Sequence, residues 1–87
     1  MANYSLIVKK SVSRDLRGIP KEDIKRILIT LQGLVDNPRS AGCEKLSGQE
    51  RYRIRQGVYR IIYEIADQQL IVTVVKIGHR NQVYQRR

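Results

Sequence analysis

The sequence predicts an α+β domain in which an N-terminal strand and two helices precede a three-stranded antiparallel meander, with the helices on one face of a small sheet. Three observations predict this class. They are an apolar stripe at helical spacing over residues 24–35, alternating apolar and basic side chains from residue 51, and a β-branched run over residues 70–77. No linker, internal repeat or low-complexity segment interrupts the chain, so we expect residues 1–87 to form a single domain.

The first expected strand covers residues 4–8, where aromatic and β-branched side chains favour extended backbone. A short helix is expected next, with Ser11 or Ser13 as its N-cap and Gly18 at its end. Pro20 suits the first turn of a second helix, because the N–H that proline lacks has no helical partner there.

The second helix is the element that the sequence defines best. Its apolar residues recur at three- and four-residue intervals and form one stripe: Ile24, Ile27, Leu28, Leu31, Leu34 and Val35. The Asp-Asn-Pro segment at residues 36–38 ends this helix. Residues 38–50 are expected to form a loop, which Gly42 and Gly48 interrupt.

An antiparallel hairpin is predicted for residues 51–64. Successive side chains of a strand point to opposite faces of the sheet, which separates two sets of residues: Tyr52, Ile54 and Gln56 on one face, and Arg51, Arg53 and Arg55 on the other. Gly57 allows a tight turn after the first strand, because glycine adopts positive φ without a steric penalty.

The last expected strand covers residues 70–77, after a turn at residues 67–68. Its nearly unbroken β-branched composition is typical of a strand that is buried on both faces at the centre of a sheet. We expect Gly78 to close this strand and residues 79–84 to form a polar tail.

The chain is strongly basic, with 17 Lys and Arg against 8 Asp and Glu, a net charge of +9. Residues 45–87 contribute +6 of this charge, so the hairpin half is the more basic half. Such a balance favours nucleic acid, an acidic protein or an anionic membrane as partner. The membrane is the weakest of these alternatives, because no helix combines a basic polar face with a large apolar face.

Several features indicate a cytoplasmic protein without a metal or cofactor. No apolar run is long enough to span a bilayer, and the N-terminal residues lack the pattern of a signal peptide. Cys43 is the single cysteine, which excludes an internal disulfide and a cysteine-based metal cluster. The chain also lacks a glycine-rich phosphate loop, a His-x-Glu pair and a Cys-x-x-Cys pair.

The hairpin places Arg53, Arg55 and Arg60 on one face of the sheet. Guanidinium groups this close together repel one another, and each is planar and shaped to bind an oxyanion through two hydrogen bonds. Phosphate is therefore the first candidate ligand. A basic strand face that is merely solvated, or that contacts an acidic partner, remains the alternative.

Any catalysis by this chain must rely on arginine, together with Lys45, His79 or Tyr84, because the carboxylates are too scattered to form an acid–base pair. Fixed guanidinium groups suit the cleavage of RNA by its own 2′-hydroxyl, since negative charge builds up on the phosphate in that reaction. Tyr59 and Tyr63 share the core-facing parity of Ile61 and Ile65, so packing is favoured over base stacking for both. For Tyr84, a ligand contact and a disordered tail are equally plausible, while His79 is more typical of a packing or surface histidine.

Four segments of the chain together resemble the RelE toxins of bacterial toxin–antitoxin modules. They are Lys-Leu-Ser-Gly at residues 45–48, Tyr-Arg-Ile-Arg at 52–55, the strand at 57–64 and, most specifically, the Gly-His-Arg-x-x-Val-Tyr motif at 78–84. The resemblance covers nearly the whole chain, including its order of elements. It implies an endonuclease that cuts mRNA in the decoding site of the ribosome, and a RelB-like antitoxin that silences it.

The resemblance also implies roles for individual residues. The phosphate-binding and catalytic arginines of the family fall on Arg60 and Arg80, and its catalytic, base-stacking tyrosine falls on Tyr84. Arg53 and Arg55 stand where the best-known members have lysines, the second of which is taken as the general base. Arginine does not lose its proton at neutral pH, so the identity of the base stays open, although we still expect Arg55 to act in catalysis.

The expected site thus has a catalytic part and an RNA-binding part: Arg55, Arg60, Arg80 and Tyr84 in the first, and Lys45, Arg51 and Arg53 in the second. Two other functions remain as alternatives. ParE-type toxins share the fold and target DNA gyrase, but they lack this constellation of residues. A non-catalytic RNA-binding module, such as a ribosomal protein, is the third possibility.

Overall fold

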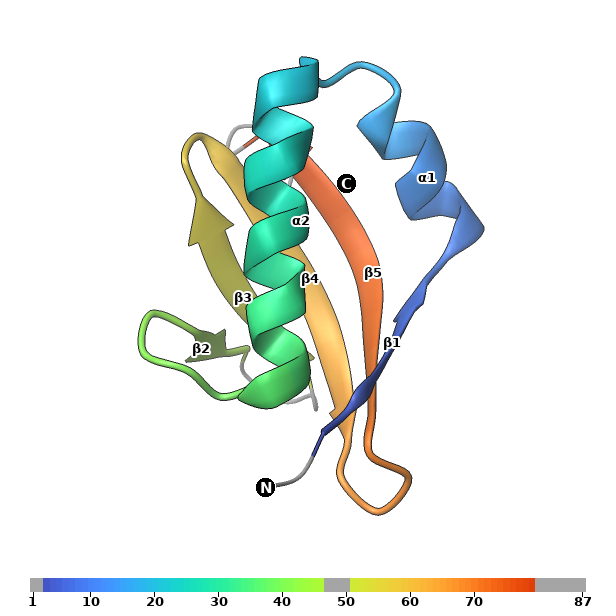
Figure 1. Cartoon of the computed structure of the whole chain (residues 1–87), viewed down its shortest axis with the longest axis vertical. Coiled ribbons are helices and arrows are strands. Elements are labelled where there is room, and N and C mark those ends of the chain that lie inside the picture. Colours follow the sequence, from blue (N-terminus) through green and yellow to red (C-terminus); the bar gives the residue numbers. More distant parts are fainter. Residues whose placement is uncertain (1–2, 47–50, 80–87) are drawn as a thin grey trace.

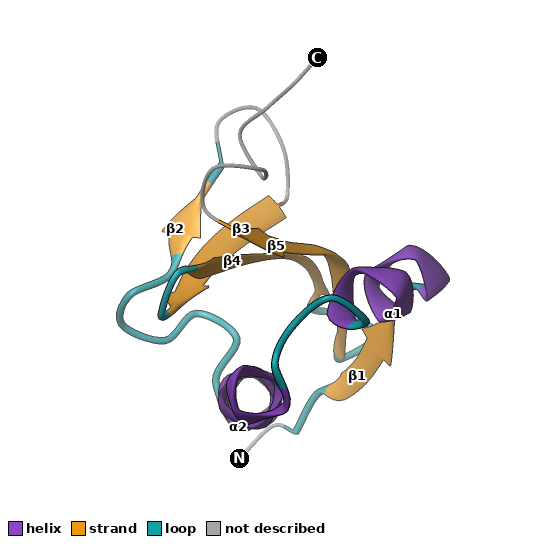
Figure 2. Cartoon of the chain, turned by 90° about the horizontal axis from the view of Figure 1, so that it is seen from above, coloured by secondary structure: helices purple, strands orange, loops and turns teal. Residues whose placement is uncertain are grey.

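The computed structural model describes residues 3–46 and 51–79. The elements, in chain order, are β1 (Ser5–Val8), α1 (Lys10–Leu16), α2 (Lys21–Asp36), β2 (Glu44–Lys45), β3 (Arg51–Gln56), β4 (Tyr59–Ala66) and β5 (Ile71–His79). The strands form one five-stranded sheet in the order β1-β5-β4-β3-β2, and α2 lies across one face of it (Figures 1 and 2). The predicted α+β class is confirmed, with β2 as an additional strand inside the expected loop.

The sheet is mixed, because its N-terminal strand is parallel to its last strand. β1 pairs with β5 from Ser5 opposite Ile71 to Val8 opposite Val74. The strands β3, β4 and β5 form the predicted antiparallel meander, and β2 adds an antiparallel edge beside β3. The two helices follow β1 directly, and α1 packs beside the part of β5 that extends beyond the end of β1 (Figure 2).

The core lies between α2 and the inner face of the sheet. Ile27, Leu31 and Leu34 of α2 are buried, and they pack with Val12 of α1 and with apolar side chains of β3, β4 and β5. The predicted stripe was too wide, since Leu28 is 51% exposed. Leu28 lies about 100° around the helix from Ile27, and a single helix on a sheet buries only its central line of side chains. None of the described helices is long and apolar enough to cross a membrane.

Several predicted boundaries were wrong in detail. Neither serine caps α1, which begins after Lys9 and has no side-chain cap. Pro20 occupies the N-cap of α2 and not its first turn. β5 continues to His79, one residue beyond Gly78, and burial alternates along most of its length, so only the face toward α2 is fully covered. The second face of β5 stays partly exposed because the described helices do not cover it (Figure 2).

The β3–β4 hairpin has the predicted geometry. Gln56 pairs with Tyr59 across a two-residue turn, and Gly57, the first turn residue, has a φ of +62°. Positive φ at this position produces a turn whose twist matches that of the flanking strands. The short turn fixes the register, and the register decides which side chains of β3 and β4 share a face.

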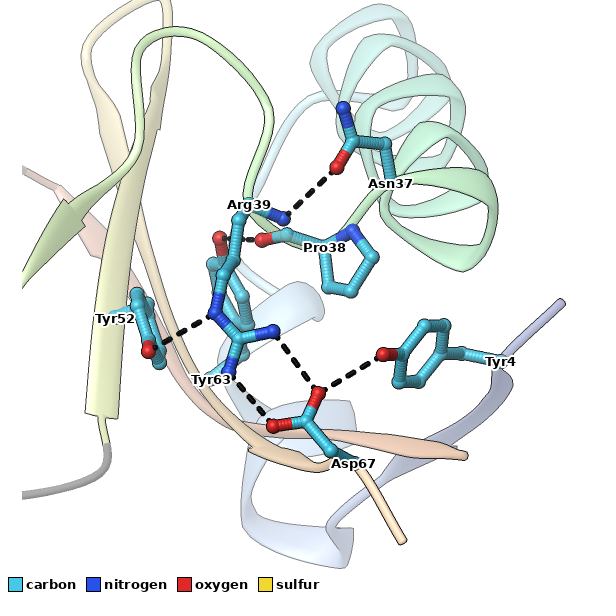
Figure 3. A network of polar contacts seen from close by, with 7 residues as sticks. All are labelled: Tyr4, Asn37, Pro38, Arg39, Tyr52, Tyr63 and Asp67. Carbon is cyan, nitrogen blue, oxygen red and sulfur yellow. Dashed lines mark hydrogen bonds and ion pairs between the residues drawn. The ribbon is translucent and has the colours of Figure 1, made fainter. Parts of the chain in front are cut away.

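A polar network joins the loop after α2 to the turn between β4 and β5 (Figure 3). Arg39 donates to both carboxylate oxygens of Asp67, each at 2.9 Å, and its Nε donates to the Tyr52 hydroxyl at 3.2 Å. Tyr4 also donates to Asp67 at 2.9 Å, which ties the segment before β1 to the same turn. The network therefore joins four segments of the chain: the one before β1, the loop after α2, β3 and the turn after β4.

Candidate functional site

The face of the sheet opposite α2 carries the basic side chains of the hairpin. Arg51, Arg53 and Arg55 of β3 pair with Glu64, Ile62 and Arg60 of β4, respectively. Residues that lie directly opposite each other on antiparallel strands present their side chains on the same face. The predicted face of Arg53, Arg55 and Arg60 is therefore confirmed as an arrangement of the sheet, and we call these residues, with Arg51, the arginine face.

Two arginines of this face have acidic partners. The Nε of Arg51 lies 2.8 Å from Oε2 of Glu64, which is its cross-strand neighbour. Arg53 forms an ion pair with Glu44, which β2 places directly opposite it. These carboxylates offset part of the positive charge at Arg51 and Arg53, and they weaken the attraction of both positions for a further anion.

The other two arginines of the face, Arg55 and Arg60, lie at the turn end of the hairpin. Arg55 is exposed and makes no hydrogen bond or ion pair with residues 3–46 or 51–79. Arg60, directly opposite, is half-buried, and its Nε and Nη1 atoms are buried. Two like charges directly opposite each other destabilise a sheet, and an anion between them would relieve this repulsion.

A shallow cavity of about 380 Å³ opens beside the arginine face, between β3 and the loop before β2. Arg53, Arg55 and Glu44 contribute to its walls, together with Ala41 and Gly42. Sequence reasoning missed Glu44, because two residues of strand produce no alternation and the segment resembles a loop. Only the pairing of β2 with β3 reveals that the Glu44 carboxylate lies beside Arg53.

The remaining predicted residues lie elsewhere. Lys45 pairs with Tyr52, so its register position is on the α2 side of the sheet, away from the arginine face. Its assignment to RNA binding stays a prediction. His79 pairs with Tyr59 on the α2 side, with ring centroids 6.2 Å apart in an edge-to-face arrangement. Arg80 and Tyr84 lie outside the described residues.

The tyrosines of the hairpin pack against the α2 side, as predicted for Tyr59 and Tyr63. Tyr63 is fully buried and donates a 2.6 Å hydrogen bond to the carbonyl of Pro38. Burial raises the pKa of the Tyr63 hydroxyl well above its usual value, so the group stays neutral. Tyr52 stacks on Tyr63 with a centroid distance of 5.8 Å. Neither ring is available to stack on a base.

Comparison with known proteins shows the protein family to which the chain belongs. Residues 6–84 match the family model described as the ParE toxin of type II toxin–antitoxin system, parDE. The chain therefore belongs to this toxin family, within the RelE/ParE superfamily, and the resemblance to RelE-type toxins is confirmed.

Individual relatives agree with this assignment. The RelE1 protein of Methanocaldococcus jannaschii is 26% identical over 85 residues, which cover 93% of this chain and 94% of that protein. A chain of the RelE–RelB complex from Pyrococcus horikoshii is 27% identical, with a TM-score of 0.82 over 94% of this chain and 99% of that one. The isolated RelE toxin of E. coli, at 24% identity, shares the fold with a TM-score of 0.77, over 93% of this chain and 90% of that one.

Proposed function

We propose that this toxin is an endoribonuclease that cuts mRNA in the decoding site of the ribosome and thereby inhibits translation. The observation that carries the proposal is the cross-strand pair of Arg55 and Arg60 on an open sheet face. Two opposed guanidinium groups suit a phosphodiester, which brings one negative charge and several acceptor oxygens. The net charge of +9 agrees with a polyanionic substrate.

The proposed reaction is transesterification at one phosphate. The 2′-oxygen of the preceding ribose attacks phosphorus, the bond to the 5′-oxygen of the next nucleotide breaks, and a 2′,3′-cyclic phosphate and a 5′-hydroxyl result. Arg60 and Arg80 bind the scissile phosphate and stabilise the charge on its equatorial oxygens. Tyr84 stacks on a neighbouring base and holds the attacking oxygen in line.

Arg55 acts as a hydrogen-bond donor in this scheme. Its exposed guanidinium orients the 2′-hydroxyl and adds to the charge stabilisation, but it does not accept the proton, because an arginine side chain stays protonated in proteins. A group of the ribosome or of the substrate takes that proton. The reaction requires no metal, since the sequence contains no carboxylate pair or histidine–cysteine cluster that would hold one.

A RelB-like antitoxin is the proposed protein partner. Several structural neighbours of this chain are chains of RelE–RelB or RelBE complexes, from Pyrococcus horikoshii and Mycobacterium tuberculosis among others. An antitoxin with acidic segments would neutralise the arginine face and exclude RNA from it. We place the toxin, its antitoxin and the ribosome in the cytoplasm.

Action on DNA gyrase is the second candidate, because the matching family model is named after ParE toxins. Mapping of cellular RNA ends after brief induction of the toxin separates the two functions. The proposed function predicts new 5′-hydroxyl ends within translated codons. A supercoiling defect or DNA breaks with intact mRNA would instead support the gyrase function.

A further inference from the structure

One lysine of β5 lies on the same side of the sheet as the arginine face. Lys76 pairs with Ile62 of β4, and Ile62 pairs in turn with Arg53 of β3. Residues that lie directly opposite one another on antiparallel strands present their side chains on the same face. Lys76 therefore extends the positive charge of the arginine face across the sheet and onto β5.

An irregularity in β5 turns Lys76 to this side of the sheet. Lys76 lies opposite Ile62 of β4. The next residue of β4, Tyr63, lies opposite Val74, so Val75 is an extra residue with no opposite residue in β4. In a regular strand Lys76 would share the face of Val74, which is fully buried in the core. The extra residue moves Lys76 to the outer face, and bulges of this kind often re-aim a side chain beside a functional site.

Arg60 and Lys76 are diagonal neighbours on this face. Arg60 pairs with Gly78, which lies two residues beyond Lys76 along β5. Diagonal neighbours on adjacent strands are about 7–8 Å apart, which is within reach of long side chains. Glycine has no side chain, so β5 presents none directly opposite Arg60. A ligand that binds at Arg60 and extends over Gly78 therefore comes within reach of Lys76.

The ammonium of Lys76 is accessible to such a ligand. Its side chain is 49% exposed, and a cavity of about 340 Å³ adjoins both Lys76 and Gly78. The acidic neighbour of Lys76 is Asp15 of α1, and the distance of 3.6 Å from Nζ to Oδ1 is longer than a hydrogen bond. This ion pair therefore uses none of the three N–H donors of the ammonium in a hydrogen bond.

We propose that Lys76 binds a second phosphate of the RNA backbone, one nucleotide away from the phosphate held at Arg60. The inference rests on the proposed function in assuming that RNA lies on the arginine face. The diagonal separation of the two side chains is comparable with the spacing of successive phosphates in extended single-stranded RNA. An ammonium suits this role, because it binds phosphate as a point charge and does not read the bases. Lys76 is thus a substrate-binding residue that positions the strand on the sheet and does not contact the reacting atoms.

The test uses the full chain and 2′-O-methylated oligonucleotides, which lack the attacking hydroxyl and stay intact. NMR titrations measure the affinity for a dinucleotide with one phosphodiester and for a trinucleotide with two. Lys76→Gln should weaken binding of the trinucleotide about fivefold, which corresponds to one typical hydrogen bond, and leave binding of the dinucleotide nearly unchanged. The slope of log K against log salt for the trinucleotide should become shallower by about 0.7, the contribution of one phosphate contact in a single strand. Lys76→Arg should retain the affinity of the wild type.

Two further variants separate phosphate binding from a structural role of the ion pair. Lys25→Gln removes the same charge from an exposed position on α2, which covers the opposite face of the sheet, and should bind both oligonucleotides as the wild type does. Asp15→Asn removes the carboxylate beside Lys76 but keeps the ammonium, so the trinucleotide should bind at least as tightly as before. If Asp15→Asn weakens binding as much as Lys76→Gln does, the ion pair acts only by holding α1 against β5, and the inference is overturned.

Two other results would also overturn the inference: an equal loss for both oligonucleotides, or a Lys76→Gln variant that is folded in thermal melting and binds the trinucleotide as the wild type does. Cleavage on translating ribosomes keeps the two proposals apart. Lys76→Gln should raise the toxin concentration needed for half-maximal cleavage and leave the maximal rate unchanged. If mRNA is cut and this concentration does not change, the inference fails and the proposed function stands. If the trinucleotide binds as expected but no RNA is cut, the proposed function fails instead.

Discussion

Arg39 and Asp67 form a two-point ion pair, in which Nη1 and Nη2 each lie 2.9 Å from a different carboxylate oxygen (Figure 3). The pair connects the loop that follows α2 with the turn that joins β4 to β5. The same loop continues into β2, the strand that places Glu44 opposite Arg53.

This ion pair predicts a loss of stability in acid. The hydrogen bonds from Arg39, and then that from Tyr4, lower the pKa of the Asp67 carboxyl below its usual value of 3.8. A carboxyl whose pKa is lower in the folded state stabilises the protein above its unfolded pKa, and that contribution is lost as the pH falls through the folded pKa. Asp67→Asn should therefore lower the melting temperature at neutral pH, and the difference from the wild type should shrink below about pH 4.

Melting curves across this pH range test the prediction. Asp36→Asn, at the exposed end of α2, is the matched control and should leave the pH dependence nearly unchanged. A difference between wild type and Asp67→Asn that stays constant down to the lowest pH would contradict the assigned role of the pair.

Tyr63→Phe should destabilise the fold by about 1–2 kcal/mol, because the buried carbonyl of Pro38 loses the donor that lies 2.6 Å away. For a domain of this size, the melting temperature should fall by roughly 4–16 °C. Tyr59→Phe removes a longer contact of 3.4 Å to Asp23 at a partly exposed site, so its effect should be smaller. Equal effects of the two substitutions in thermal or urea unfolding would refute this account.

Arg60→Ala should abolish growth arrest and reduce mRNA cleavage about 100-fold or more, the loss expected when one fixed donor to a developing oxyanion is removed. Arg17→Ala removes the same charge from the exposed end of α1 and should remain toxic. Both variants must be expressed at the same level, and both must unfold cooperatively in thermal melting. A folded Arg60→Ala variant with full toxicity would argue against phosphate binding at this position.

Arg55 should tolerate lysine but not alanine. Lysine keeps the positive charge and has the more easily shifted pKa, so Arg55→Lys should retain or increase cleavage, whereas Arg55→Ala should lose it. Quantitative mapping of 5′-hydroxyl ends on translating ribosomes measures both. Cleavage that stops in chelator, or that leaves a 5′-phosphate on the downstream fragment, would refute the metal-independent mechanism.

Antitoxin binding should raise the apparent stability of the toxin through mass action, by about 2.7 kcal/mol at a free antitoxin concentration 100-fold above Kd. The effect should weaken with added salt, because the charge of the arginine face is expected to contribute to the affinity. Thermal melting with the product of the adjacent gene, at two salt concentrations, is the measurement. An unchanged melting temperature at saturating concentration would count against that protein as the antitoxin.

The sequence by itself determined the class of fold and the arginine face. The long helix, the tight turn at Gly57 and the alternation over residues 51–56 are local patterns, and each depends on backbone geometry that neighbouring residues specify. The sharing of one face by Arg55 and Arg60 follows from that alternation and a two-residue turn. The exposed Leu28 shows the limit of such reasoning, since a periodic pattern does not reveal how wide a strip the partner surface covers.

Only the tertiary structure decided the contacts between distant segments. The parallel pairing of β1 with β5 joins residues more than 60 positions apart, and no local signal encodes it. No local signal predicts three side-chain contacts either: Glu44 with Arg53, Arg39 with Asp67, and Asp15 with Lys76. These pairs depend on the register of strands and on how the helices pack against the sheet, and both are settled by burial across the whole domain. That is why the face of the site was predictable from the sequence, while Glu44 as an acidic partner of Arg53 was not.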